Sequence, residues 1–309
     1  MSGYIDLQVN GYAGVDFNSD TLTTDEVVEV CRRLKADGTD SILATVITAR
    51  MDLMLLRISR LVELIESSAE IADCIRGIHV EGPFLNPADG FIGAHPASDA
   101  KPADIGSTDQ LLDAGNGNIK MVTLAPEMDA DARVTNYLTG RGIVVAAGHS
   151  DASLIDLNRA IDHGLKLFTH LGNGCPGLLH RHDNIVQRVL AVSERLKISF
   201  IADGHHVPAF ALRNYFGMVP HENIIIVTDA ISAAGLGPGR YELSGQVVEV
   251  DEDGAAWAAC RTHYAGCAST FQQMIEVLKE SVGVSDAQIR QWMIENPLRL
   301  LAVDHASGR

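Results

Sequence analysis

The residues best suited to chemistry lie far apart in this sequence, and each follows a short apolar run. Glu81, His149, His170 and Asp229 all stand in this position. An ionised carboxylate behind a buried strand is unfavourable unless it is paired or bound to a metal. One carboxylate and two imidazoles suit a catalytic Zn²⁺ or Fe²⁺ site with an open position for water. We therefore interpret Glu81, His149 and His170 as ligands of a divalent metal.

Each of these residues, taken singly, also has a structural interpretation. Glu81 can be a carboxylate in a salt bridge, and each histidine can be a hydrogen-bonded structural residue. Asp229 is our candidate for the general base, because a carboxylate near an activated water can take its proton and pass it to a leaving amine. The alternative role for Asp229 is a helix N-cap, a position that favours Asp.

Further polar residues follow the same runs or lie in the loops between them. His205 and His206 are adjacent, so they cannot both point the same way, and His95 has no structural role that the sequence indicates. Asn173 and Arg181 follow the sixth apolar run. The planar guanidinium of Arg181 suits a phosphate or a carboxylate, although a solvated or interface arginine fits the pattern equally well.

The elements that must position these residues alternate along the chain. Continuous apolar runs predict strands covered on both faces, at residues 4–9, 41–47, 75–80, 119–124, 143–147, 167–168, 198–202 and 224–227. Amphipathic stretches predict helices at residues 23–35, 52–66, 153–163, 184–193, 208–216 and 270–282. Eight strands alternating with helices favour a closed parallel (β/α)8 TIM-type barrel. In that fold the strand ends meet at one mouth, where catalytic residues gather.

Two stretches interrupt this alternation. Residues 84–108 form a long predicted loop after the third strand, rich in Pro, Gly and Asp. Residues 235–262 follow the eighth strand and predict a β-hairpin insertion, with strands at 240–243, 246–250 and 256–260 and a turn at Asp253-Gly254. Long loops at this end of a barrel are usually lids or substrate walls. Thr23 and Glu26 predict a capping box at the start of the first helix.

Composition limits the class of partner and the compartment. The 309 residues carry a formal net charge of −16, which disfavours nucleic acid and anionic membranes as partners. The five cysteines are scattered and contain no Cys-x-x-Cys pair, which is typical of a reducing compartment. The N-terminus has no signal-peptide pattern and no stretch approaches the ~20 apolar residues of a membrane helix. We expect a cytoplasmic, soluble protein.

A set of motifs occurs in a fixed order along nearly the whole chain. The motifs are Ile5-Asp-Leu-Gln-Val-Asn-Gly11, His79-Val-Glu-Gly-Pro-Phe-Leu-Asn-Pro87, Gly93-Ala-His95, Leu124-Ala-Pro-Glu127, Gly148-His-Ser-Asp-Ala152, Thr169-His-Leu171, Ala202-Asp-Gly204 with His206-Val207, Val227-Thr-Asp-Ala-Ile-Ser-Ala-Ala-Gly235 and residues 296–300. No single motif is specific, but the set is. With this set, the chain resembles the N-acetylglucosamine-6-phosphate deacetylase family of the amidohydrolase superfamily.

This resemblance implies a role for each matching residue. Glu81, His149 and His170 would bind one divalent metal per subunit, most simply Zn²⁺, with Fe²⁺ or Mn²⁺ as alternatives. Gln8 and Asn10 stand where many amidohydrolases have a His-x-His pair, which argues against a second metal. Asp229 would be the acid/base of N-acetyl amide hydrolysis and His95 would polarise the acetyl carbonyl. The substrate-binding residues would be His206 for the sugar, and Asn173, Gly174 and Arg181 for the phosphate, with Arg181 reaching in from the partner of a homodimer.

The chain departs from the family pattern in three places. We expect residues 1–309 to form a single barrel domain that lacks most of the family's small β-sandwich. The segment Gly172-Asn-Gly-Cys175 replaces the usual aromatic, Asn, Ala and Met, and the loop between Glu81 and His95 is slightly longer than usual. The last two changes concern the sugar and phosphate pocket, so they bear on the substrate and not on the metal.

Three functional hypotheses follow. The first is a deacetylase that converts N-acetylglucosamine 6-phosphate to glucosamine 6-phosphate and acetate. The second keeps the chemistry and changes the substrate to another N-acetylhexosamine, phosphorylated or free, or to another amide. The third is a non-catalytic sugar-phosphate sensor, which gives no reason for all of Glu81, His149, His170 and Asp229 to be present. A purely structural protein would not need polar residues at strand ends.

Overall fold

A parallel sheet of eight strands forms the centre of the molecule. The computed structural model describes residues 3–243, 246–258, 261, 264 and 266–302. The sheet order is β1-β4-β5-β6-β7-β8-β9-β10, and every neighbouring pair is parallel. Its strands are β1 (Tyr4–Val9), β4 (Thr39–Ile47), β5 (Ile75–Glu81), β6 (Ile119–Leu124), β7 (Val144–Ala147), β8 (Leu165–Phe168), β9 (Lys197–Ile201) and β10 (Ile224–Val227). These strands match the eight predicted runs to within a few residues.

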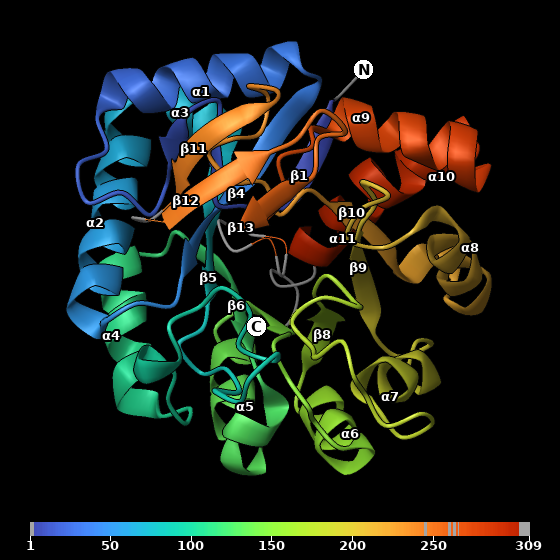
Figure 1. Ribbon diagram of the computed structural model, residues 1–309. Helices are drawn as coiled ribbons and strands as arrows, with labels where there is room; N and C mark the ends of the chain where they lie inside the picture. The colour runs from blue at the N-terminus through green and yellow to red at the C-terminus, as the bar shows by residue number, and fades with distance from the viewer. Residues whose placement is uncertain (1–2, 244–245, 259–260, 262–263, 265, 303–309) are drawn as a thin grey trace.

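Helices form an outer ring around these strands (Figure 1). The α-helices are α1 (Thr24–Ala36), α2 (Met51–Ser67), α3 (Ala69–Cys74), α4 (Ile105–Gly115), α5 (Arg133–Thr139), α6 (Leu154–Asp162), α7 (Ile185–Ala191), α8 (Ala209–Met218), α9 (Phe271–Glu276), α10 (Asp286–Arg290) and α11 (Asn296–Ala302). Two π-helical segments, η5 (Val277–Val282) and η6 (Gln291–Glu295), extend α9 and join α10 to α11. Short 3₁₀ turns occupy η1 (Ala97–Asp99), η2 (Pro126–Met128), η3 (Ala130–Ala132) and η4 (His221–Asn223).

The first and last strands of the sheet meet and close the barrel. Val9, at the end of β1, forms a parallel bridge with Ala230, which lies three residues after the end of β10. The backbone N–H of Asn10 donates to the Ala230 carbonyl at 2.8 Å. Asp6 of β1 adds side-chain contacts across the same seam, because it accepts hydrogen bonds from the backbone N–H (3.2 Å) and hydroxyl (2.5 Å) of Thr228. The fold is therefore a TIM-type barrel, as predicted.

Local sequence accounts for the main boundaries of these elements. The α1 helix begins after Thr23, whose side chain forms the predicted capping box with Glu26. The strands β7 and β10 are buried at every residue, as continuous apolar runs predict. The predicted loop at 84–108 ends earlier than expected, because the Asp104 side chain caps α4 by accepting from the backbone N–H of Ser107. Among the described residues, no helix combines the length and apolarity needed to cross a bilayer.

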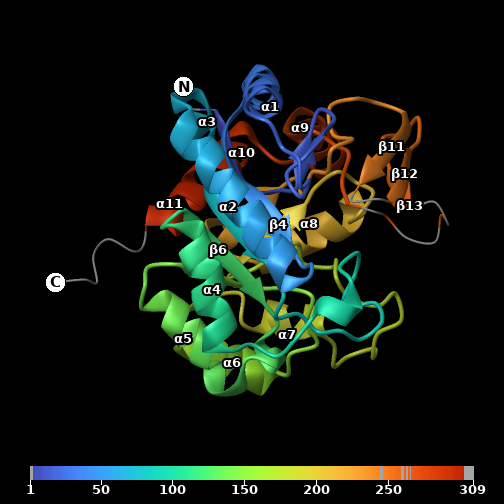
Figure 2. The same cartoon turned by 90° about the vertical axis from the view of Figure 1, so that its left-hand side faces the viewer.

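Two small antiparallel sheets lie beside the barrel. One pairs β2 (Gly11–Tyr12) with β3 (Val15–Asp16) directly after β1. The other follows β10 and contains β11 (Gly239–Leu243), β12 (Gln246–Val250) and β13 (Ala256–Ala258) in that order. Residues 259–260 of the predicted third strand lie outside the described residues. In Figure 2 this sheet and the loop after β5 lie on the same side of the barrel, opposite α11.

Candidate active site

A cavity of about 810 Å³ opens at the carboxyl ends of the strands. Eight of the nine residues predicted for the site line it: Glu81, His95, His149, His170, Asn173, Gly174, His206 and Asp229. Residues from the ends of β5, β7, β8 and β10 and from the loops after β5, β8 and β9 therefore meet at one place, as the barrel geometry predicts. The ninth residue, Arg181, is exposed to solvent and does not line this cavity.

Three of the lining residues have a left-handed backbone. The φ angles of His149, His170 and Asp229 are 51°, 35° and 52°. A β-carbon makes this region unfavourable for residues other than glycine, and residues held there by their surroundings gather at functional sites. Each of the three comes two residues after the end of its strand, so the sharp change of direction turns its side chain toward the cavity.

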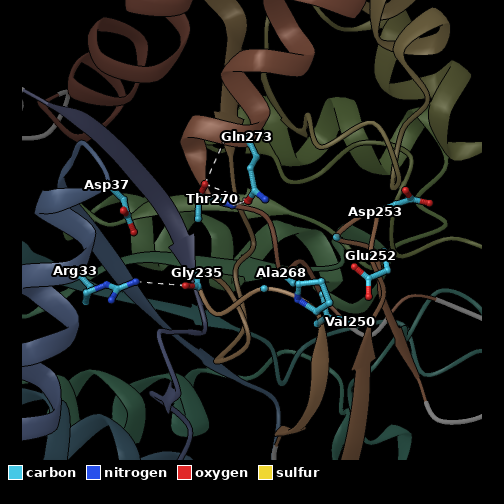
Figure 3. Close-up of a pocket in the computed structure, with 12 residues that line it drawn as sticks. Arg33, Asp37, Gly235, Val250, Glu252, Asp253, Ala268, Thr270 and Gln273 are labelled. Carbon is cyan, nitrogen blue, oxygen red and sulfur yellow. Dashed lines mark hydrogen bonds between the residues drawn. The ribbon is translucent and has the colours of Figure 1, made fainter.

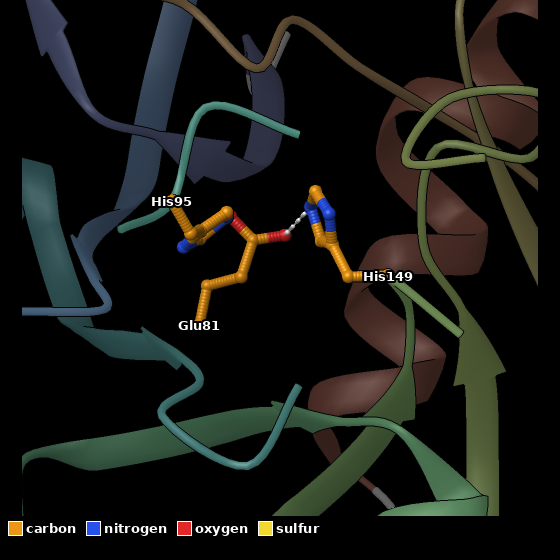
Figure 4. A group of neighbouring side chains, drawn as sticks. All are labelled: Glu81, His95 and His149. Atoms are coloured by element: carbon orange, nitrogen blue, oxygen red, sulfur yellow. Dashed lines mark ion pairs between the residues drawn. The ribbon is translucent and has the colours of Figure 1, made fainter. Parts of the chain in front are cut away.

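Glu81 stands at the centre of three imidazoles. Its Oε1 lies 3.0 Å from His170 Nε2 and 3.5 Å from His149 Nε2, and its Oε2 lies 3.7 Å from His95 Nε2. Figure 4 shows the Glu81 carboxylate between the rings of His95 and His149. The His149 ring also packs edge-on against the rings of His95 and His170, with centroids 4.5 and 4.9 Å apart. All four side chains are buried.

In the rings of His149 and His95, the hydrogen bond made by Nδ1 indicates whether Nε2 carries a lone pair or a proton. His149 Nδ1 lies 2.8 Å from the carbonyl oxygen of Phe91, which can only accept, so Nδ1 carries the proton and Nε2 is free to bind a metal. His95 Nδ1 accepts the backbone N–H of Thr48 at 3.3 Å, so its Nε2 carries the proton. His149 is thus suited to bind a metal, and His95 is suited to donate a hydrogen bond.

The spacing of these donor atoms fits a metal. Bonds of about 2.1 Å in a tetrahedral site place neighbouring ligand atoms about 3.4 Å apart. The separations of 3.5 and 3.0 Å from Glu81 to His149 and His170 are close to this value. Glu81, His95 and His149 also bring one ligand atom each within 4.8 Å of one another. The side chains therefore offer a divalent ion a carboxylate and at least two imidazoles.

The electrostatics of the site favour the same arrangement. Burial opposes ionisation of Glu81, but hydrogen bonds to His149 and His170 outweigh it and hold the pKa of this carboxyl well below its usual value. Burial lowers the pKa of His95 to about 3, with a further contribution from His149, so His95 is neutral at ordinary pH. Burial opposes the charged form of His170, but the hydrogen bond to Glu81 outweighs it and raises the pKa of this imidazole. A metal ion would take the place of that proton, because it binds an ionised carboxylate and neutral imidazoles.

Two amide side chains, Gln8 on β1 and Asn10 just after it, hold Asp229 in place. Gln8 Nε2 donates to Asp229 Oδ1 and to Glu81 Oε1, at 3.0 Å in each case, and Asn10 Nδ2 donates to Asp229 Oδ1 at 2.8 Å. Gln8 is itself oriented by the Thr169 hydroxyl, which donates to its Oε1 at 2.6 Å. Among the described residues, no hydrogen bond reaches Oδ2 of Asp229. Burial, followed by the charge of Glu81, raises the pKa of Asp229, which suits a group that must take and return a proton.

The adjacent histidines after β9 point in different directions. His205 Nε2 lies 2.9 Å from the carbonyl oxygen of Asp253, so this ring joins the loop to the β11–β13 sheet. His206 lines the cavity, and its Nδ1 lies 2.7 Å from Asp203 Oδ2. The sequence showed that the pair must diverge, and the positions of Asp203 and Asp253 determine which ring lines the cavity.

Part of the cavity wall was not expected from the sequence. Ile231, Trp257 and Tyr264 line the cavity from the segment after β10. The Trp257 and Tyr264 rings are in contact, with centroids 4.4 Å apart, and Trp257 Nε1 donates to Asp251 Oδ2 at 2.9 Å. An aromatic residue in a predicted insertion gives no signal of where the insertion folds, so only the position of the whole segment at the mouth was predictable.

A smaller cavity of about 280 Å³ lies between α1, the start of α9 and the insertion (Figure 3). Its lining includes Arg33, Asp37, Glu252 and Gln273. The Arg33 guanidinium donates to the Gly235 carbonyl at 3.4 Å. None of the residues predicted for catalysis or metal binding lines this cavity, so we assign the reaction to the larger one.

Comparison with known proteins gives a consistent result. A human protein named N-acetylglucosamine-6-phosphate deacetylase is 33% identical over 316 residues, which cover 99% of this chain and 75% of the relative. A protein of Escherichia coli O157:H7 named N-acetylgalactosamine-6-phosphate deacetylase is 30% identical over 305 residues, which cover 99% of this chain and 78% of the relative. No family model matches the sequence.

Solved structures agree with these relatives. A variant of the N-acetyl-D-glucosamine-6-phosphate deacetylase from Mycobacterium smegmatis, in complex with N-acetyl-D-glucosamine-6-phosphate, superposes with a TM-score of 0.86 at 29% identity. The superposition covers 97% of this chain and 77% of that protein.

Proposed function

Because the chain belongs to the N-acetylglucosamine-6-phosphate deacetylase family, we propose that it hydrolyses the N-acetyl amide of N-acetylglucosamine 6-phosphate to give glucosamine 6-phosphate and acetate. The observation that carries this proposal is the convergence of Glu81, His149, His170 and Asp229 on one cavity. A sensor that only bound the sugar would not need a carboxylate with raised pKa beside a metal-competent cluster.

We propose Glu81, His149 and His170 as the ligands of one divalent ion per subunit, with Zn²⁺ as the first candidate. When bound, the ion would lower the pKa of a water molecule and polarise the acetyl carbonyl. Gln8, which occupies the place of a possible further ligand, donates its amide hydrogens to Glu81 and Asp229. An amide donor there fits a single ion better than two, because its N–H groups face the carboxylates.

Asp229 supplies the proton transfers of this reaction. Gln8 and Asn10 hold its Oδ1, which leaves Oδ2 as the oxygen that takes a proton from the attacking water. The same carboxyl then protonates the nitrogen of the departing amine, and its raised pKa favours the intermediate protonated state. His95 donates from Nε2 to the acetyl oxygen as negative charge develops on it.

The remaining predicted residues would bind the sugar phosphate. His206, Asn173 and Gly174 line the cavity and are in a position to contact a bound sugar. Gly174 has a φ of 62°, and a β-carbon there would lie 2.8 Å from His149 Nδ1, so its backbone passes close to the proposed metal ligand. Arg181 is exposed, which is compatible with a contact to a second subunit's substrate. We propose a homodimer on this basis.

A second candidate substrate has a specific observation in its favour. The Escherichia coli O157:H7 relative is named for the galactosamine epimer, at an identity close to that of the human relative. We therefore keep N-acetylgalactosamine 6-phosphate as the alternative, with the same residues and the same chemistry.

The test is acetate release by the Zn²⁺-reconstituted protein from four sugars: the 6-phosphates of N-acetylglucosamine and N-acetylgalactosamine, and each free sugar. We expect release from N-acetylglucosamine 6-phosphate at the highest kcat/KM. Preference for the galactosamine epimer would replace the substrate and keep the mechanism. Release from none of the four, with one equivalent of metal bound, would refute the proposed activity.

The Asp229→Asn variant provides the matched control. It keeps the hydrogen-bond geometry around Oδ1 but cannot accept a proton, so we expect kcat to fall by about 10²–10⁴-fold while metal content stays at that of the wild type. A sensor protein would bind its ligand equally well with either residue and would show no turnover to lose.

The single-barrel organisation and the cytoplasmic location also stay predictions. We propose that the barrel alone carries the reaction, because every residue assigned a chemical role belongs to it. The scattered cysteines continue to favour a reducing compartment.

A further inference from the structure

We propose that Asp203 is a positioning residue that fixes the His206 imidazole with its proton on Nδ1, so that Nε2 faces the cavity as an acceptor for a sugar hydroxyl. This inference rests on the proposed function, because it takes the cavity to be a sugar site. It adds a residue to which no role has yet been assigned, and it specifies which chemical group His206 presents to the substrate.

The two oxygens of Asp203 make separate sets of contacts. Oδ1 accepts the backbone N–H groups of His205 and His206, both at 2.9 Å, and so shapes the turn after β9. Oδ2 lies 2.7 Å from His206 Nδ1 and accepts the Cys267 thiol at 3.4 Å. The division matters, because shaping the turn needs Oδ1 alone, whereas only Oδ2 acts on the imidazole ring.

The carboxylate determines which ring nitrogen carries the proton. Burial opposes ionisation of Asp203, but the hydrogen bond to His206 outweighs it and lowers the pKa of this carboxyl. An ionised carboxylate can only accept, so Nδ1 must be the donor of the 2.7 Å contact. A neutral His206 then has its lone pair on Nε2, and the side chain lines the cavity.

The other face of His206 is also fixed. Its ring lies 5.0 Å from the Tyr264 ring, which in turn contacts Trp257 at 4.4 Å between centroids. Both aromatic residues line the same cavity. A sugar ring presents C–H groups on its face and hydroxyl groups at its edge, so an aromatic wall beside a fixed acceptor suits it. Two side chains from different parts of the fold therefore restrict the rotation of one imidazole.

Asp203, His206 and Cys267 also bring ligand atoms within 4.8 Å of one another, as a second metal site would. The hydrogen bonds argue against that use. Both His206 and Cys267 point a hydrogen at the same carboxylate oxygen. Burial and the negative charge of Asp203 raise the pKa of the Cys267 thiol far above its usual value, which disfavours the thiolate that a metal needs. We therefore interpret the three residues as a hydrogen-bonded group.

The test variant is Asp203→Asn. The amide oxygen can still accept the two backbone N–H groups, so the turn is retained. The amide NH₂ now faces His206 Nδ1 and donates to it, so the imidazole must move its proton to Nε2. Nitrogen-15 NMR of histidine-labelled, Zn²⁺-loaded protein distinguishes the two tautomers, with the His206 signal assigned by its loss in His206→Asn. We expect the Nδ1–H form in the wild type and the Nε2–H form in Asp203→Asn.

The kinetic consequence should appear in KM. We expect Asp203→Asn to raise KM for the preferred amide substrate about tenfold, the equivalent of one hydrogen bond of about 1.4 kcal/mol, and to change kcat less than about threefold. Cys267→Ser is the matched control, because it keeps a donor to the same oxygen without touching the His206 contact. We expect its KM to stay within about twofold of the wild type.

A double variant tests whether Asp203 acts through His206. In a His206→Asn background, Asp203→Asn should have no further effect on KM. A wild-type His206 in the Nε2–H form, an unchanged KM in Asp203→Asn, or a second equivalent of bound Zn²⁺ lost on substitution would each overturn the proposal. The tautomer measurement needs no substrate, so it decides the Asp203–His206 contact even if no tested sugar is deacetylated and the proposed function fails.

Discussion

Three residues of the candidate site, His149, His170 and Asp229, hold a backbone conformation that their side chains disfavour. Strain of this kind amounts to about 1–3 kcal/mol per residue and persists only where surrounding contacts fix it. In this chain those contacts are hydrogen bonds at the strand ends, such as the Ser199 hydroxyl that accepts the His170 N–H at 2.9 Å. The strain places the imidazoles and the carboxylate over the mouth of the barrel, where they face Glu81.

Exchange of single histidines should separate the metal ligands from the hydrogen-bond donor. We expect His170→Gln to reduce bound Zn²⁺ from one equivalent per subunit to a small fraction, because it removes an imidazole 3.0 Å from Glu81 Oε1. We expect His95→Gln to retain the metal and to lose kcat by about 10²–10³-fold, as removal of an oxyanion donor does. Atomic absorption on dialysed protein measures the first quantity and steady-state kinetics the second.

The opposite result would reassign the ligands. Loss of metal in His95→Gln with retention in His170→Gln would mean that Glu81, His95 and His149 form the site, an arrangement that their separations also permit.

At the scale of elements, the contact between β1 and the end of β10 links the closure of the barrel to the position of Asp229. Asp6 of β1 is fully buried and accepts hydrogen bonds from Thr228, the residue before Asp229. Burial is the main cause that raises the pKa of Asp6, to about 7. The folded protein therefore holds this proton more tightly than the unfolded chain does, and folding is favoured while Asp6 stays protonated.

Stability should consequently fall as pH rises from about 4 toward 7, by at most about 1.4 kcal/mol per pH unit from this group. We expect Asp6→Asn to lack this contribution, so that the difference in free energy of unfolding between wild type and variant changes across pH 5–7. Urea unfolding of the metal-free proteins measures it. Asp25→Asn, at an exposed position of α1, is the control and should follow the wild-type curve. Parallel curves for Asp6→Asn and wild type would contradict the assignment.

The sequence predicted the elements whose apolar pattern was continuous or strongly periodic. It did not predict α4 and α5, and their sequences explain why. The α4 helix contains glycine at both Gly106 and Gly115, and Leu111 is its one buried large apolar residue. The α5 helix is short and contains the β-branched Val134 and Thr135, which are not strong helix formers. Packing against the sheet stabilises these two helices, and this packing cannot be predicted from the sequence of a single segment.

The candidate site divides in a similar way. Barrel topology alone places residues at strand ends together, so the cluster of Glu81, His149, His170 and Asp229 could be predicted from the sequence. The bridging role of Gln8 and the aromatic wall of Trp257 and Tyr264 could not, because both depend on contacts between segments far apart in the chain.

For the whole molecule, metal binding and folding should be coupled. Glu81 is buried among imidazoles, and an ion that binds only this folded arrangement stabilises it by mass action. We expect removal of the metal by a chelator to lower Tm by several degrees, and Zn²⁺ at about 1,000 times its Kd to restore about 4 kcal/mol. Differential scanning calorimetry with and without added Zn²⁺ measures the shift. An unchanged Tm in protein shown to be metal-free would contradict the coupling.

The exposed position of Arg181 leads to a prediction about assembly. We expect Arg181→Ala to raise KM for a phosphorylated substrate and to leave KM for the free sugar unchanged, because guanidinium groups bind phosphate in a two-pronged contact. Mixed dimers of Arg181→Ala and Asp229→Asn subunits should regain activity. One of their two sites then contains the intact Asp229 of one subunit and the intact Arg181 of the other. Mixtures no more active than the separate variants would place Arg181 outside any shared site.

The closure of the barrel at Val9 and Ala230 has a consequence for how activity arises during folding. Gln8 joins the first strand to Glu81 on β5 and to Asp229 after β10, so the catalytic arrangement includes residues from both ends of the barrel sequence. A chain that has assembled every barrel strand except β10 would hold the proposed metal ligands Glu81, His149 and His170 and still lack an oriented Asp229. Turnover therefore requires complete closure of the barrel. We expect a partly folded chain to be inactive, not weakly active.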